Sequence, residues 1–74
     1  MQIVYLRYGA KGKQPAVILE KSKVPGKIRV RKYRANSHRL TQPMAVSESE
    51  IVRDERPSNH TRNLILAVLR ADAS

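Results

Sequence analysis

Glycine and proline divide the first half of this chain into short segments, and their spacing limits what it can fold into. Gly9 and Gly12 bracket one turn, and Pro25-Gly26 forms another, in which proline presets the backbone and glycine supplies a positive φ. The segments between these turns are apolar, or rich in β-branched and aromatic residues, which favours strands. We therefore predict three strands, over residues 2–8, 15–23 and 27–34.

The third of these segments alternates most plainly. Because side chains in a strand alternate between two faces, Ile28 and Val30 fall on one face. The other face carries Lys27, Arg29, Arg31 and Tyr33. Lys32 and Arg34 interrupt the apolar face, so we expect the strand to leave the core there or to contain a bulge.

The second half predicts two further short strands and a helix. Residues 40–46 can form a fourth strand at an edge or bulge, because Pro43 lacks a backbone N–H. Residues 47–52 resemble a short helical turn leading into a last strand, and residues 54–59 a linker. Ser58 or Thr61 can then cap a helix whose apolar face carries Leu64, Ile65, Val68 and Leu69. A helix this short must dock on the sheet or on a second copy.

Size and composition exclude several classes of protein. A chain of 74 residues without cysteine forms one domain with no disulfide, and His38 and His60 cannot assemble the usual four-ligand zinc site. Residues 9–13 are too short for a phosphate-binding P-loop. No Ser-His-acid set, paired-carboxylate site or glycine-rich cofactor motif is present, so we expect no enzyme activity, metal or cofactor.

The charge is concentrated in one half of the chain. Lysine and arginine number 15 against 6 acidic residues, giving a net charge of +9. Ten of these cations precede residue 35, against Glu20 alone, whereas five cations match five acids afterwards. Such an excess attracts polyanions, nucleic acid first among them. The expected contacts are Arg7, Lys11, Lys13, Lys27, Arg29, Arg31, Lys32, Arg34 and Arg39, with Tyr33 stacking on an unpaired base.

The order of segments resembles a small SH3-like or Tudor-like barrel. Val4-Tyr5-Leu6-Arg7 and Pro15-Ala16-Val17-Ile18-Leu19 are similar to segments of the DNA-binding barrel at the C-terminus of retroviral-type integrases and transposases. Glu50-Ile51-Val52 matches the helical turn before the last barrel strand. The resemblance covers about residues 3–53 and implies contact with a nucleic-acid backbone. Three tyrosines without tryptophan or phenylalanine supply a methyl-reading aromatic cage poorly.

The expected fold is mainly β: an SH3-like barrel of four to five antiparallel strands over residues 1–56, followed by a C-terminal helix over residues 57–74. The first functional hypothesis is a module that binds DNA or RNA, single-stranded or double-stranded, with low sequence specificity. Such a module suits an accessory factor of a mobile element, phage or small operon. No apolar run of about 20 residues and no secretory signal is visible, so we expect a cytoplasmic protein without membrane contact.

The alternative hypothesis is a protein-interaction adaptor. Its barrel would bind an acidic partner, and its C-terminal helix would mediate dimerisation or docking through Leu64, Ile65, Val68 and Leu69. The helix separates the two hypotheses, because removing it would abolish association in the second and spare charge-driven binding in the first. Neither hypothesis includes a small-molecule substrate.

Overall fold

The chain folds into an antiparallel sheet followed by one α-helix. The computed structural model describes residues 2–10 and 12–73, apart from the side chains of Lys21 and Ala73. Its elements are β1 (Gln2–Tyr8), β2 (Gly12–Lys21), β3 (Lys27–Arg34), β4 (Arg39–Leu40), β5 (Met44–Ser47), the 3-10 helix η1 (Glu48–Glu50), β6 (Ile51–Val52) and α1 (Asn59–Ala73). The predicted class, mainly β with a C-terminal helix, is confirmed.

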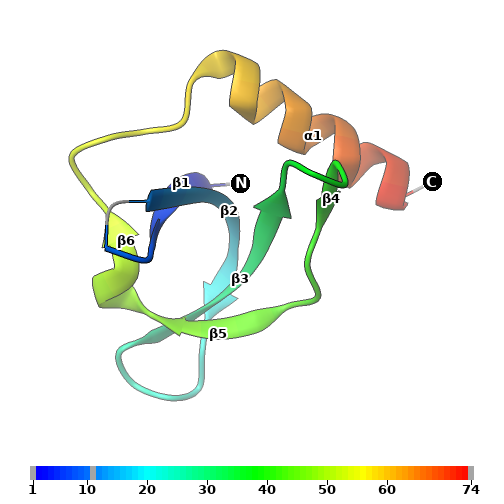
Figure 1. Cartoon of the computed structure of the whole chain (residues 1–74). Coiled ribbons are helices and arrows are strands. Elements are labelled where there is room, and N and C mark those ends of the chain that lie inside the picture. Colours follow the sequence, from blue (N-terminus) through cyan, green and yellow to red (C-terminus); the bar gives the residue numbers. More distant parts are fainter. Residues whose placement is uncertain (1, 11, 74) are drawn as a thin grey trace.

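The six strands form one curled, open sheet. Its order is β4-β3-β2-β1-β6, and β5 pairs with the first half of β3. Figure 1 shows the strands curving around a common centre, with β5 and α1 on opposite sides. No ladder joins β5 to β6 among the described residues, so the sheet is not closed as the expected barrel would be.

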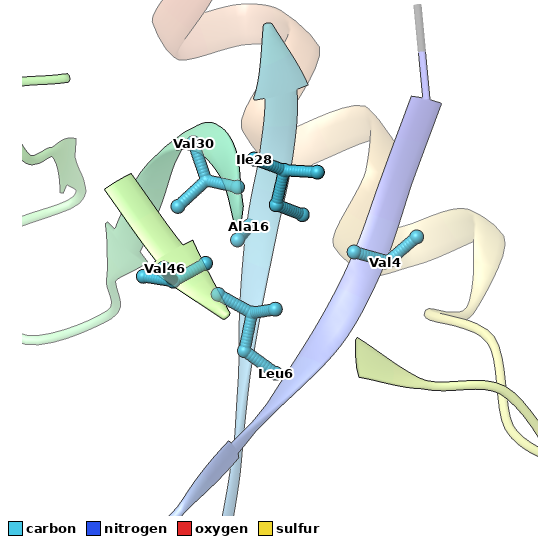
Figure 2. Packing of buried hydrophobic residues seen from close by; sticks show 6 residues of the cluster. All are labelled: Val4, Leu6, Ala16, Ile28, Val30 and Val46. Atoms are coloured by element: carbon cyan, nitrogen blue, oxygen red, sulfur yellow. The ribbon is translucent and has the colours of Figure 1, made fainter. Parts of the chain in front are cut away.

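One face of the sheet turns inward and forms a core. Val4 and Leu6 of β1, Ala16 of β2, Ile28 and Val30 of β3 and Val46 of β5 are all buried there. Figure 2 shows their side chains pointing toward one another. The period-two pattern places these residues on one face, and each buried valine, leucine or isoleucine contributes about 1.5–3 kcal/mol relative to exposure.

The opposite face is covered by α1. Ile3, Val17 and Tyr33 of the sheet pack against Ile65 and Val68 of the helix. Leu64 and Leu69 are half-buried at the margins of this contact. Ser58 precedes the helix and its Oγ accepts a hydrogen bond from the Thr61 N–H, so it is the cap. The four residues expected at an interface therefore dock on the chain's own sheet.

Two short sequence motifs, the Pro-Gly turn and the helical turn before the last strand, form the structures that were expected. In the turn between β2 and β3, the Lys27 N–H donates to the Val24 carbonyl, and Gly26 has a φ of 78°. Pro25 followed by a positive-φ glycine is typical of a type II turn. Before β6, Ser47 and Glu50 form a reciprocal capping box around η1, which confirms the predicted helical turn.

The segment predicted as one strand, residues 40–46, is instead split. β4 pairs with the last residues of β3, and β5 with its first four residues. Pro43 lies between β4 and β5, where its lack of a backbone N–H breaks no hydrogen bond of the sheet. β3 therefore changes partner after Val30 and leaves the core at Lys32. This departure was one of the two outcomes expected from the sequence. The bulge lies in β2 instead, between Ile18 and Glu20.

Candidate nucleic-acid interface

Three of the predicted contacts are engaged by acidic side chains. Arg29 lies 3.1 Å from the carboxylate of Glu20, which is on the neighbouring strand. Lys13 pairs with Glu55 of the segment before α1. Arg31 contacts Asp72 at 3.1 Å, and its Nε donates to the Thr41 carbonyl at 2.9 Å. Since Asp72 belongs to α1, Arg31 joins the end of the helix to the sheet.

Tyr33 is not positioned to stack on a base. Its side chain is 6% exposed and lies beneath α1. Its hydroxyl is hydrogen-bonded to Nδ1 of His38 at 2.7 Å, and the two rings meet at an angle of 85°. The alternation of β3 correctly places Tyr33 with Arg29 and Arg31, but this face is the one that the helix covers. Tyr33 is therefore part of the helix–sheet contact.

The exposed Arg34 and Arg39 and the half-buried Lys32 lie on the other face of β3 and β4. Arg34 of β3 stands directly opposite Arg39 of β4, and both side chains are exposed. Lys32 precedes Arg34 by two residues and so shares its face, about 6.6 Å along the strand. We call Lys32, Arg34 and Arg39 the cationic ladder. Within the described part of the chain, no acidic side chain forms an ion pair with any of the three.

The backbone holds the cationic ladder in a fixed arrangement. The N–H of Lys32 donates to Oγ1 of Thr41 at 2.9 Å, and the N–H of Thr41 donates to the Lys32 carbonyl at 2.8 Å. These bonds continue the β3–β4 pairing beyond Leu40. Like charges directly opposite one another in an antiparallel pair are destabilising, so this arrangement has an electrostatic cost that a bound anion would remove.

The other predicted contacts do not join the cationic ladder. Lys27 begins β3, whereas Arg34 ends it, and the seven steps between them span about 23 Å. Arg7 is exposed at a surface hollow that Glu48 and Asp54 also line. Lys11 lies outside the described residues. The structure therefore brings together three of the ten predicted contacts; Arg39 also lines a hollow with Asp72, whose carboxylate pairs with Arg31.

Tyr8 is a candidate that the sequence did not single out. Its side chain is 65% exposed, although alternation places it on the same face as Val4 and Leu6. β1 extends past the end of the core at this residue, and Gly9, with a φ of 64°, turns the chain immediately afterwards. The only sequence signal for its exposure is this neighbouring glycine, which marks the strand end.

Metal sites and membrane-spanning segments are two further possibilities. Among residues 2–10 and 12–73, no three histidine, cysteine, aspartate or glutamate side chains lie close enough together to hold a metal ion. Over the same residues, no helix is sufficiently long and apolar to cross a bilayer. Comparisons with protein-family models, curated proteins and solved structures found no match. Function is therefore inferred from the residues and geometry of this chain.

Proposed function

We propose that this chain is a nucleic-acid-binding module that contacts the phosphate backbone through the cationic ladder. The observation that carries the proposal is the direct opposition of Arg34 and Arg39, with Lys32 on the same face and no acidic partner among the described residues. The chain's net charge of +9 adds a long-range attraction for any polyanion. Phosphate contacts fix position and carry no base information, so low sequence specificity follows.

The spacing of the cationic ladder suits a chain of phosphates. Opposite residues of an antiparallel pair lie about 5 Å apart at Cβ, and alternate residues of a strand about 6.6 Å apart. Long arginine and lysine side chains can adjust these separations by several rotatable bonds. Each neutralised phosphate releases condensed counterions, which makes the affinity fall with salt concentration.

A small SH3-like barrel, opened along one side, is the finer fold that we propose. The order β5-β3-β2-β1-β6, with a 3-10 helix between β5 and β6, supports it. The resemblance to the DNA-binding barrel of integrases and transposases then bears on residues 3–53, and α1 is an addition with no counterpart there. In this chain α1 covers the sheet face that carries Arg29 and Arg31, so binding uses the opposite face.

Titration at several salt concentrations tests the proposal. Duplex DNA, single-stranded DNA and RNA are each titrated with the wild-type chain and with an Arg34→Gln, Arg39→Gln double variant. The log–log salt slope on duplex DNA should fall by about 0.9 for each phosphate contact removed, or about 1.8 for the pair. The matched control is Arg53→Gln with Arg56→Gln, which makes the same change in net charge at two exposed arginines outside the cationic ladder.

The control should keep most of the wild-type affinity and slope. Two results would contradict the proposal. In one, the wild-type chain binds none of the three nucleic acids at low salt. In the other, the control pair weakens binding as much as the Arg34 and Arg39 pair, which would mean that diffuse charge is responsible and not the cationic ladder.

A further inference from the structure

A groove opens where three parts of the chain meet. The start of α1, the first residues of β2 and the loop after β3 enclose a volume of about 670 Å³. Its walls include Tyr8, Pro15 and Leu64, with the amide side chains of Gln14 and Asn36 between them. Such a mixture, mostly apolar surface with a few polar groups, is typical of sites that hold a flat organic ring.

Tyr8 presents an aromatic ring at this groove. Tyr8 pairs with Gly12 across the β1–β2 ladder, and its Cδ1 lies 3.4 Å from the position that a Cβ on Gly12 would occupy. A side chain at position 12 would also approach the Tyr8 carbonyl oxygen to 2.5 Å, so only glycine fits there. The ring therefore rests beside bare backbone and keeps 65% of the side chain exposed.

Tyr8 is also the single exposed ring among the three tyrosines, all of which the structure describes. Tyr33 is 6% exposed beneath α1. Tyr5 is half-buried, and the ammonium group of Lys13 lies 5.7 Å from its ring centroid. An exposed aromatic ring on a strongly cationic chain, here of net charge +9, is the combination that single-strand-binding proteins use for stacking bases.

The groove includes the two residues that follow strand β3 of the cationic ladder in the chain. Ala35 and Asn36, which line the groove, follow Arg34 directly in the chain. The groove wall is fixed, because Nε2 of Gln14 donates to the Tyr33 carbonyl at 3.0 Å. Asn36 lines the groove together with Tyr8, and its exposed amide is available to the polar edge of a base.

We propose that the groove binds an unpaired nucleobase stacked on Tyr8, so that the preferred ligand is single-stranded nucleic acid. This inference rests on the proposed function and specifies its ligand. Bases within a duplex are already stacked on one another and present no free ring face, whereas a single strand can place a base against Tyr8. The net charge of +9 on the chain favours a polyanion such as nucleic acid over an apolar peptide as the occupant.

The test compares a single-stranded DNA oligonucleotide of mixed sequence with an abasic strand of equal length, which keeps the phosphates and lacks the bases. The variants are Tyr8→Ala and, as the matched control that keeps the ring, Tyr8→Phe. Tyr8→Ala should weaken binding of the base-bearing strand by about 5-fold to 100-fold and leave binding of the abasic strand unchanged. Tyr8→Phe should bind like the wild type, and the salt slope should be the same in all three chains.

A nuclear magnetic resonance titration supplies a second readout. The ring protons of Tyr8 should shift upfield when the base-bearing strand binds, and those of Tyr33 should not. The inference is overturned if the wild-type chain binds the abasic strand as tightly as the base-bearing one, or if Tyr8→Ala binds both as the wild type does. Either result leaves phosphate binding intact, whereas failure to bind any strand at low salt overturns the proposed function itself.

Discussion

At the scale of single residues, Tyr33 and His38 show how one contact shapes the surface around it. His38 has a φ of 53°, a left-handed conformation that non-glycine residues rarely adopt. The hydrogen bond between its Nδ1 and the Tyr33 hydroxyl, at 2.7 Å, holds it there. Because His38 ends the turn between β3 and β4, this contact sets the position from which Arg39 begins β4 opposite Arg34.

Tyr33→Phe should therefore lower the stability of the fold without creating a cavity in the core. The phenyl ring retains the packing against α1, and the variant loses only the hydrogen bond to His38, worth about 1 kcal/mol. For a domain of this size, that corresponds to a fall in Tm of about 4–8 °C, measured by circular dichroism. His38→Ala should cost a similar amount, and the double variant should cost less than the sum. A Tyr33→Phe chain as stable as the wild type would contradict this role.

At the scale of elements, local sequence signals were sufficient to predict the bounds of some strands and insufficient for others. The bounds of β1 and β3 follow from alternation and from the adjoining turns, and both agree with the sequence prediction. The split between β4 and β5 does not follow from them, because it depends on β3 exchanging one partner for another after Val30. Lys32, Arg34 and Arg39 were each predicted as contacts, but their grouping in the cationic ladder was not, because the pairing of Arg34 with Arg39 depends on the same exchange of partners.

The helix illustrates the same limit. Its apolar face and its cap are local properties, and the sequence predicted the face and limited the cap to Ser58 or Thr61, of which Ser58 is the one used. The surface that it covers is a tertiary property, so the sequence left its docking on the sheet and on a second copy as equal alternatives. The docked arrangement buries Ile65 fully and places Asp72 against Arg31, which withdraws Arg31 and Tyr33 from the predicted binding face.

Ile65→Ala tests this docking. Ile65 is 0% exposed between α1 and the sheet, so truncation should cost about 2–5 kcal/mol, a large part of the stability of so small a domain. The midpoint of urea denaturation should fall accordingly. Ala67→Ser, on the exposed side of the same helix, serves as the control and should change the midpoint little. Equal midpoints for Ile65→Ala and the wild type would show that the helix does not depend on this contact.

At the scale of the whole molecule, the net positive charge lowers the stability of the folded state. Fifteen cations share the chain with six acidic side chains, of which Glu20, Glu55 and Asp72 form ion pairs with arginine or lysine among the described residues. Glu50 is used in the capping box before β6. The folded state brings the remaining cations closer together than the unfolded chain does, and the cationic ladder concentrates three of them. The proposed binding and the stability of the fold therefore place opposite demands on the same residues.

This conflict predicts that added salt stabilises the protein while weakening the proposed binding to nucleic acid. Surface charges are screened over about 10 Å at 0.1 M ionic strength, so raising sodium chloride from a few millimolar to that level relieves the repulsion between Arg34 and Arg39. Tm should rise by several degrees. The three exposed ion pairs are screened as well, but exposed pairs contribute at most about 1 kcal/mol each, and repulsive pairs outnumber them in a chain of net charge +9.

Arg39→Gln separates the cationic ladder from the general charge. It removes the repulsion opposite Arg34, so at low salt it should raise Tm relative to the wild type, and the difference should shrink as salt is added. Arg53→Gln removes the same charge from the segment after β6 and should raise Tm less. A Tm that falls with salt, or an Arg39→Gln chain less stable than the wild type at low salt, would mean that Arg39 makes a stabilising contact instead. The opposed arginines would then not be an unfilled anion site, and the electrostatic argument for phosphate binding would lose its basis.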